Sequence, residues 1–110
     1  MKLNTAKYKL TIYTEKTCPG CTELKSLLKG NSIPFIEKNI TKDPTKRKGP
    51  NVDNRWEYMD ITQLSEYQDE VLLVPLVVVE HVDGNITHHS ANYDFDEAQE
   101  GLEVLKQYFI

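Results

Sequence analysis

Both cysteines of the chain lie in one tetrapeptide, Cys18-Pro19-Gly20-Cys21. A disulfide between residues so close in sequence constrains the unfolded chain very little, so these thiols are not placed to staple a fold. Before the tetrapeptide, residues 8–13 alternate apolar and polar side chains, and after it apolar residues recur at helical spacing up to Gly30-Asn31. The pattern predicts a strand, a CxxC pair and a helix in that order, a context typical of redox chemistry.

The two cysteines are expected to play different parts. A thiol attacks only as its thiolate, so a redox cysteine needs a lowered pKa and access to solvent. Cys18 falls where the strand ends and the helix begins, so first-turn N–H groups and the positive end of the helix dipole face its sulfur. Cys21 follows about one helical turn later and can reach Cys18 in a disulfide while lying deeper. We therefore predict that Cys18 attacks and that Cys21 resolves.

Two other interpretations of the cysteines are open. Two buried cysteines can share a helix start without any chemistry, although the strand-CxxC-helix context favours the redox interpretation. A zinc site needs two further ligands, and the three histidines, His81, His88 and His89, do not have the spacing of a companion ligand pair. We expect no bound metal, and we expect His88 and His89 to be a solvated pair.

Three more strands are predicted after the first helix. Residues 33–40 favour a strand with a proline at its start. Residues 71–79 are strongly apolar and rich in β-branched side chains, which predicts a strand buried on both faces with Pro75 at its beginning. Asp83-Gly84-Asn85 is a hairpin turn signal, so residues 86–89 are expected to return antiparallel.

A loop and two helices account for the remaining segments. Residues 41–55 contain two prolines, a glycine and five basic residues, which predicts a long surface loop. Residues 56–68 favour a short helix. The last segment opens with Asp94 and Glu97 in capping-box spacing and predicts a C-terminal helix of about fourteen residues.

This order of elements predicts an α/β fold. A crossover helix between the first two strands favours parallel pairing, and the turn at residues 83–85 favours an antiparallel hairpin. We expect a mixed four-stranded sheet flanked by about three helices. With 110 residues, 39% of them hydrophobic, the chain has room for one core, so residues 1–110 are expected to form a single domain.

Charge and hydropathy exclude several classes of partner. Thirteen Lys and Arg against seventeen Asp and Glu give a formal net charge of −4, which argues against a general nucleic-acid or anionic-membrane binder. The N-terminus has no signal-peptide core, and no segment approaches the ~18 apolar residues of a membrane span. We expect a soluble cytoplasmic protein.

Three parts of the sequence together resemble a known family. The run from Tyr13 to Cys21, the pair Val74-Pro75 and the pair Tyr93-Asp94 resemble a dithiol glutaredoxin of the thioredoxin fold. The resemblance covers nearly the whole chain. The length of the chain and its looped middle are also similar to those of the small glutaredoxins that large bacteriophages encode.

The resemblance implies a thiol-disulfide oxidoreductase that uses glutathione as co-substrate. Cys18 would attack a glutathione mixed disulfide, and Cys21 would resolve protein disulfides. The implied partner is a disulfide-containing client protein, for example ribonucleotide reductase, and the implied state is a monomer. The backbone of Val74 would pair with the cysteinyl group of glutathione. The remaining glutathione positions would be Tyr13 beside the thiol, Lys16, Thr17, Pro75, and Tyr93 with Asp94 at the γ-glutamyl end.

The chain departs from the family pattern at three places. Gly20 replaces the central tyrosine of the usual CPYC, Glu15 stands where many members have lysine, and Ala91-Asn92 replaces a Gly-Gly pair. Lys16 can substitute in holding a glutathione carboxylate, but Glu15 would repel it. Three alternatives therefore stay open: an electron donor reduced by thioredoxin reductase, a glutaredoxin that binds a [2Fe–2S] cluster because Gly20 removes bulk, and a non-catalytic protein-binding adaptor.

Overall fold

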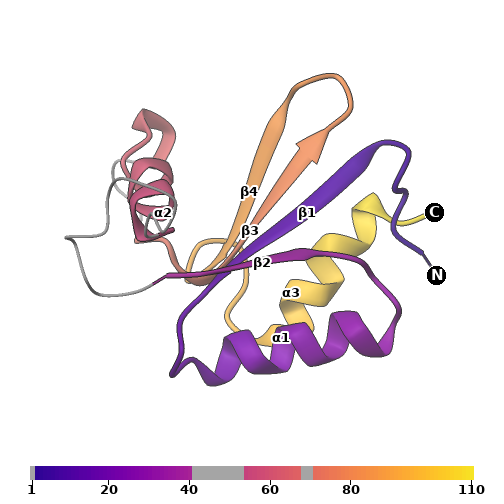
Figure 1. Ribbon diagram of the computed structural model, residues 1–110, viewed down its shortest axis with the longest axis horizontal. Coiled ribbons are helices and arrows are strands. Elements are labelled where there is room, and N and C mark those ends of the chain that lie inside the picture. The colour runs from indigo at the N-terminus through magenta and orange to yellow at the C-terminus, as the bar shows by residue number, and fades with distance from the viewer. Residues whose placement is uncertain (1, 41–53, 68–70) are drawn as a thin grey trace.

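The computed structural model describes residues 2–40, 54–67 and 71–110. Four strands, three α-helices and two 3₁₀ segments alternate along these residues (Figure 1). In chain order they are β1 (Tyr8–Thr14), α1 (Pro19–Gly30), β2 (Ile36–Asn39), α2 (Arg55–Thr62), η1 (Ser65–Tyr67), β3 (Leu73–His81), β4 (Ile86–Ala91), α3 (Ala98–Leu105) and η2 (Lys106–Tyr108).

The strands form one mixed sheet in the order β2-β1-β3-β4. β1 runs parallel to β2 and antiparallel to β3, where Ile12 lies opposite Val77. β4 pairs antiparallel with β3. Parallel pairing across the α1 crossover and an antiparallel hairpin at the end are both confirmed, and so is the mixed four-stranded sheet with three helices among the described residues.

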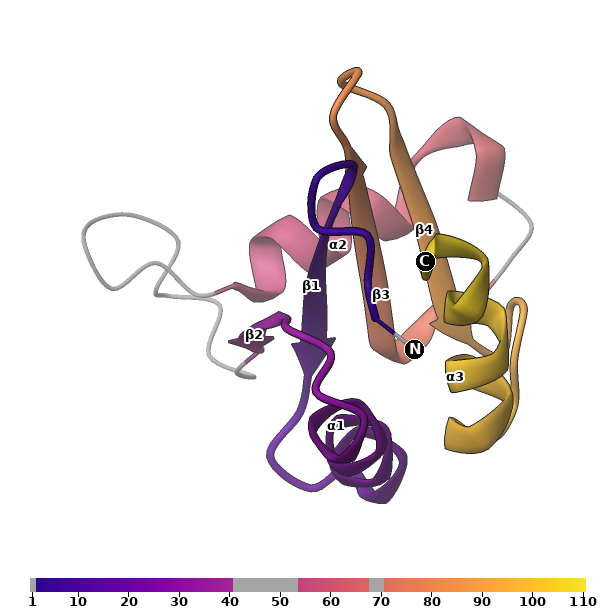
Figure 2. The same cartoon turned by 90° about the vertical axis from the view of Figure 1, so that its right-hand side faces the viewer.

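Helices cover both faces of this sheet. α1 and α3 lie side by side on one face, and α2 lies on the other (Figures 1 and 2). Successive side chains of a strand point to opposite faces, so both faces of β3 are buried, as predicted. The larger core, under α1 and α3, includes Leu10, Ile12, Leu24, Leu28, Val77, Val79, Leu102 and Leu105. The smaller core, under α2, consists of Tyr13, Ile40, Leu76 and Val78.

The pairing of β1 with β3 determines where the CxxC pair meets the Val-Pro pair. The two strands are antiparallel, so the last residues of β1 lie beside the first residues of β3, with Tyr13 opposite Leu76. α1 follows β1 after a four-residue connection. The start of α1 and the start of β3 therefore meet at one end of the sheet.

The turn between β3 and β4 has the expected form. Gly84 adopts φ of +94°, a left-handed conformation that glycine tolerates without a steric penalty. Its N–H donates to the carbonyl oxygen of His81 at 2.9 Å, and Asp83 accepts a hydrogen bond from the N–H of Asn85 at 2.9 Å. The hairpin predicted from Asp83-Gly84-Asn85 is confirmed.

Two of the strand and loop boundaries differ from the prediction. The strand expected over residues 33–40 is restricted to Ile36–Asn39, because Pro34 has no N–H to contribute to a ladder. α2 begins at Arg55, so the loop predicted over 41–55 ends earlier than expected. Residues 41–53 of that predicted loop lie outside the described residues.

Both of the later helices are shorter than predicted. The helix expected over 56–68 ends at Thr62 and is followed by η1. The C-terminal helix begins at Ala98, because the capping box is formed by Glu97 and Glu100 rather than by Asp94 and Glu97. Glu97 N–H donates to the Glu100 side chain at 3.2 Å. Eight α-helical residues and the 3₁₀ segment η2 therefore replace a helix of about fourteen residues.

Within residues 2–40, 54–67 and 71–110, no helix combines the length and the apolar character that crossing a membrane requires.

Candidate active site

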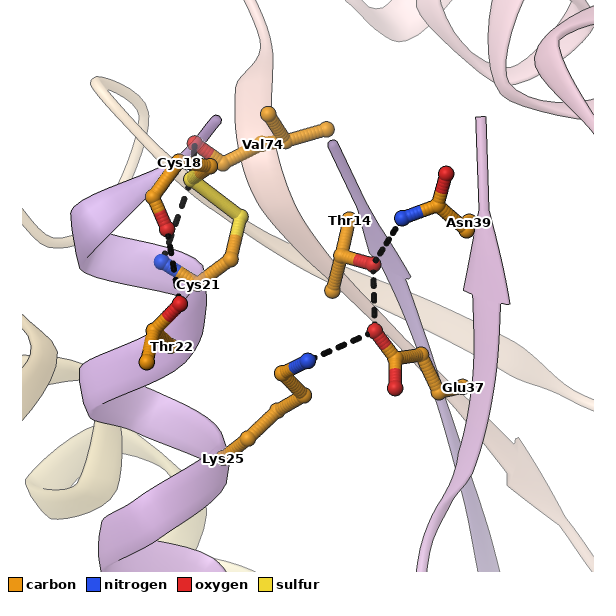
Figure 3. Close-up of a disulfide and its surroundings, with 8 residues drawn as sticks. All are labelled: Thr14, Cys18, Cys21, Thr22, Lys25, Glu37, Asn39 and Val74. Carbon is orange, nitrogen blue, oxygen red and sulfur yellow. Dashed lines mark hydrogen bonds and ion pairs between the residues drawn. A yellow bond between two sulfur atoms is a disulfide. The ribbon is translucent and has the colours of Figure 1, made fainter. Parts of the chain in front are cut away.

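The two cysteines lie at the start of α1, as predicted. Cys18 is the N-cap residue, Pro19 is the first helical residue, and Cys21 lies in the first turn. The preference of proline for this position follows from its missing N–H and its helical φ. Cys18 and Cys21 form a disulfide with their Cα atoms 5.2 Å apart (Figure 3).

The start of α1 is suited to holding negative charge on Cys18. The N–H of Cys21 donates to Cys18 Sγ at 3.1 Å, and the first turn of the helix contains no acidic residue. Backbone N–H groups at a helix start stabilise an anion, so the same geometry stabilises a thiolate when the disulfide opens. Cys18 is half-buried, whereas Cys21 is 1% exposed. A reagent from solvent therefore meets Cys18 first.

The Val-Pro pair of β3 lies against the disulfide. The Val74-Pro75 peptide bond is cis, an isomer that the sequence does not reveal. Cys18 Sγ lies 3.9 Å from the carbonyl oxygen of Val74, and Figure 3 shows Val74 directly above the two sulfur atoms. A Cβ on Gly20 would lie 3.8 Å from Pro75 Cδ, an ordinary contact. The two motifs, far apart in sequence, thus form one site.

A polar network that the sequence analysis missed lies between α1 and the strands β1 and β2 (Figure 3). Thr14 is fully buried and donates its hydroxyl to Glu37 at 2.7 Å, and Lys25 donates to the same carboxylate oxygen at 2.8 Å. The hydrogen bond from Lys25 is the main reason that the pKa of Glu37 is lowered. These contacts tie β1, β2 and α1 together, and only the tertiary fold brings their residues within reach.

Tyr13 is held on the face of the sheet that α2 covers. Its side chain is 5% exposed, and its hydroxyl donates to Glu57 at 2.8 Å. Lys38 lies 2.7 Å from the same carboxylate oxygen. Burial, with a smaller contribution from Glu57, raises the pKa of Tyr13. Tyr13 packs in the cluster that Val74 joins, and its predicted role beside the thiol stays a prediction.

The predicted glutathione contacts before the helix lie in an exposed connection. Lys16 and Thr17 are both exposed in the segment that joins β1 to α1, and Glu15 before them is half-buried. These residues directly precede the half-buried Cys18 in the sequence. Their roles toward glutathione remain as the resemblance implied them.

Asp94 does not lie at a helix start, which corrects the predicted setting of the γ-glutamyl site. It lies in a turn after β4, four residues before α3. One carboxylate oxygen accepts the N–H of Ser90 at 2.8 Å, and the other bonds to Nδ1 of His89. Tyr93 beside it is 42% exposed. The backbone N–H that binds the Asp94 carboxylate therefore comes from the end of β4 rather than from α3.

In the Ala91-Asn92 pair that replaces Gly-Gly, Asn92 has a left-handed backbone conformation. Asn92 adopts φ of +68°, a conformation that asparagine tolerates better than most residues with a side chain. Its side-chain amide donates to the carbonyl oxygen of Val71 at 3.1 Å. Asn92 thus links the end of β4 to the segment just before β3.

The prediction that His88 and His89 form a solvated pair is wrong, because both are buried. They are 9% and 8% exposed and lie on opposite faces of β4. Nδ1 of His88 is 2.9 Å from the hydroxyl of Tyr67, and Nε2 of His89 is 2.6 Å from the hydroxyl of Tyr108. Alternation along the strand is the one sequence signal that points to this arrangement.

Among the described residues, no group of three or more His, Cys, Asp or Glu side chains is arranged to hold a metal ion.

Comparisons with known proteins found a family model and several individual proteins to which this chain is similar. The family model described as Glutaredoxin matches residues 10–79, which contain both cysteines and the Val-Pro pair. The global transcriptional regulator Spx 1 of Oceanobacillus iheyensis is 26% identical over 98 residues, which cover 89% of this chain and 70% of that protein. The crystal structure of the thioredoxin-like protein BC3987 is 25% identical and has a TM-score of 0.47, with 88% of this chain and 99% of that chain covered. A mutant of BC3987 is similar at 23% identity, with the same TM-score and 91% and 97% of the two chains covered.

Proposed function

The chain belongs to the glutaredoxin family, and we propose that it is a glutathione-dependent thiol-disulfide oxidoreductase. The observation that carries the proposal is the Cys18–Cys21 disulfide at the start of α1, with Val74 O 3.9 Å from Cys18 Sγ. A site of this kind pairs an accessible sulfur, whose thiolate the helix start stabilises, with a second sulfur that is buried. Nucleophilic exchange at one sulfur followed by resolution at the other is the chemistry that such a pair can perform.

The proposed reduction proceeds in two exchanges. The Cys18 thiolate attacks one sulfur of the client disulfide, and the other client sulfur leaves as a thiolate. The Cys21 thiolate then attacks Cys18 Sγ, which releases the second client thiolate and forms the Cys18–Cys21 disulfide. Two electrons pass from the dithiol to the client, and the enzyme reaches the oxidised state of Figure 3.

Regeneration is proposed to use two molecules of glutathione. The first glutathione thiolate attacks Cys18 Sγ and frees the Cys21 thiolate. The second attacks the glutathione sulfur of the mixed disulfide, so glutathione disulfide leaves and the dithiol is restored. During this step Val74 would pair with the cysteinyl backbone of glutathione as an added strand, and Asp94 would receive the ammonium of the γ-glutamyl end.

The client and the compartment are part of the same proposal. A protein disulfide formed during turnover, for example that of ribonucleotide reductase, is the proposed client. Regeneration by glutathione needs a compartment in which glutathione is kept reduced, so we place the protein in the cytoplasm. We further propose that it acts as a monomer.

A coupled assay on a small glutathione mixed disulfide tests the proposal. It is run once with glutathione and glutathione reductase and once with NADPH and thioredoxin reductase. Turnover in the first assay is expected. Turnover in the second alone, repeated on a protein disulfide, would show that Glu15 and Ala91-Asn92 have removed glutathione use. Anaerobic purification with glutathione tests the cluster alternative, since a bound [2Fe–2S] cluster gives visible absorbance.

A further inference from the structure

His89 is a buried histidine with partners on both ring nitrogens. Its side chain is 10% exposed, Nδ1 faces Asp94 Oδ2, and Nε2 lies 2.6 Å from the hydroxyl of Tyr108. An ionised carboxylate can only accept hydrogen bonds, so the nitrogen that faces Asp94 carries a proton. Burial raises the pKa of Tyr108, so its hydroxyl keeps its proton and can donate to Nε2 of a neutral ring. The ring is thus fixed by one bond on each side.

These contacts leave part of the Asp94 carboxylate free. The N–H of Ser90 occupies one lone pair of Oδ1, and His89 occupies one of Oδ2. A carboxylate has about four lone-pair sites, so two remain unoccupied by the residues that the structure describes. The Asp94 side chain is 27% exposed, whereas the His89 side chain behind it is 10% exposed. The Asp94 carboxylate is therefore more accessible to a ligand from solvent than the ring of His89 to which it is bonded.

We propose that His89 is a positioning residue that orients Asp94 to receive a ligand ammonium group. The proposal rests on the proposed function, in which that ammonium belongs to the γ-glutamyl end of glutathione. His89 and Ser90 N–H together fix the plane of the carboxylate, and Tyr108 fixes the plane of the His89 ring. Preference for disulfides that carry an α-ammonium group follows from this arrangement, because a fixed carboxylate binds a cation without a further loss of side-chain freedom.

The neighbouring histidine provides a matched control. His88 is equally buried on the opposite face of β4, where its ring bonds to Tyr67 rather than to Asp94. Loss of either ring removes one buried imidazole–phenol hydrogen bond. Only the loss of His89 releases Asp94, so a difference between the two variants reports on positioning rather than on stability.

The test measures steady-state kinetics on two substrates that differ in one group. One is the mixed disulfide of glutathione with a short cysteine peptide, and the other is the same compound with hydrogen in place of the α-amino group. We expect the unmodified protein to show a lower KM for the first, and His89→Leu to raise that KM about tenfold, equivalent to about 1.4 kcal/mol, with kcat unchanged. On the substrate without the amino group, His89→Leu should change little.

Two further variants sharpen the comparison. The side-chain amide of His89→Asn can donate from near the position of Nδ1, so it should restore most of the preference. His88→Leu should keep the full preference. If His89→Leu does not fold, Tyr108→Phe replaces it, since it leaves Nε2 without its donor and should reduce the preference about threefold, a smaller loss than that of the direct bond to Asp94.

The outcomes separate this inference from the proposed function. An equal rise in KM on both substrates in His89→Leu, or an unchanged preference in Tyr108→Phe, overturns the positioning role. An unmodified protein that turns over both substrates with the same KM also overturns it, while the oxidoreductase function stands. Absence of turnover on any glutathione mixed disulfide, together with activity on protein disulfides, overturns the glutathione dependence itself.

Discussion

Cys18 Sγ and the carbonyl oxygen of Val74 lie 3.9 Å apart although 56 positions separate the two residues. Antiparallel pairing of β1 with β3 creates this contact, because it sets the end of one strand beside the start of the other. A substrate that pairs with the backbone of Val74 as an added strand would present its own sulfur next to Cys18. The contact therefore joins the reacting atom to the element that would orient the substrate.

Replacing each cysteine separately should divide the activity. Cys18→Ser is expected to abolish all disulfide reduction. Cys18 is the more exposed of the two sulfurs at the start of α1, so its loss removes the thiol that a substrate can reach. Cys21→Ser should keep part of the activity on glutathione mixed disulfides, which need one thiol, and should lose activity on protein disulfides, which need resolution. Initial rates on the two kinds of substrate measure this division. Equal losses in both variants on both substrates would contradict it.

Replacing Gly101 and Gly30 by alanine should change the free energy of unfolding in opposite directions. A Cβ at Gly101 would lie 3.1 Å from Phe95 Cε2, inside the larger core. Overpacking costs about 1–3 kcal/mol and exceeds the gain of about 0.5–1 kcal/mol from replacing a helical glycine. Gly101→Ala should therefore lower the free energy of unfolding by about 1 kcal/mol.

Gly30 supplies the control for that substitution. It ends α1, and among the described residues no heavy atom beyond its chain neighbours and its own helix backbone lies within 4 Å of an added Cβ. Gly30→Ala should raise the free energy of unfolding by about 0.5 kcal/mol, because only the propensity term acts there. Urea titration of both variants measures the two changes, and changes of the same sign would show that the contact with Phe95 relaxes freely.

The arrangement around the cysteines could be predicted from sequence because its signals are local. Strand alternation before Cys18, proline at position 19 and helical spacing after Cys21 all lie within about one strand and one helix of each other. The sheet topology could also be predicted from the sequence, because a crossover helix and a turn at residues 83–85 each restrict strand pairing to one direction.

Features that depend on distant partners could not be predicted. Asp94 and Glu97 have the same spacing as Glu97 and Glu100, so both pairs satisfy a capping box by sequence. His89 and Ser90 bind the Asp94 carboxylate, and the helix starts four residues later. The phenol partners of His88 and His89 are 21 and 19 residues away, beyond the reach of any periodicity.

Removal of the Tyr13 hydroxyl should weaken the attachment of α2. Tyr13→Phe keeps the buried ring but removes the donor to Glu57, which retains Lys38 at 2.7 Å. A single hydrogen bond contributes about 1 kcal/mol, so the free energy of unfolding should fall by about that amount. Chemical denaturation measures the loss. An unchanged stability would mean that water replaces the phenol at the Glu57 carboxylate without cost.

Stability should fall as the pH is lowered through the titration of His88. Burial lowers the pKa of His88 below its ordinary value of 6.5, so the folded state binds a proton less readily than the unfolded chain. His88 therefore contributes stability that is present above pH 6.5 and is lost as the pH falls toward the lowered folded-state pKa. One proton changes the free energy of unfolding by at most about 1.4 kcal/mol per pH unit.

His88→Leu isolates this contribution from the other titrating groups. Free energies of unfolding are measured by urea titration for the unmodified protein and for the variant, once at about pH 7.5 and once at about pH 5.5. These two pH values lie roughly one unit above and below the ordinary pKa of histidine. The unmodified protein should lose more stability between these conditions than His88→Leu, because the leucine has no proton to bind. Tyr67 loses its partner in the variant at both pH values, so that cost cancels in the comparison. Equal losses in the two proteins would mean that burial of His88 does not affect its protonation.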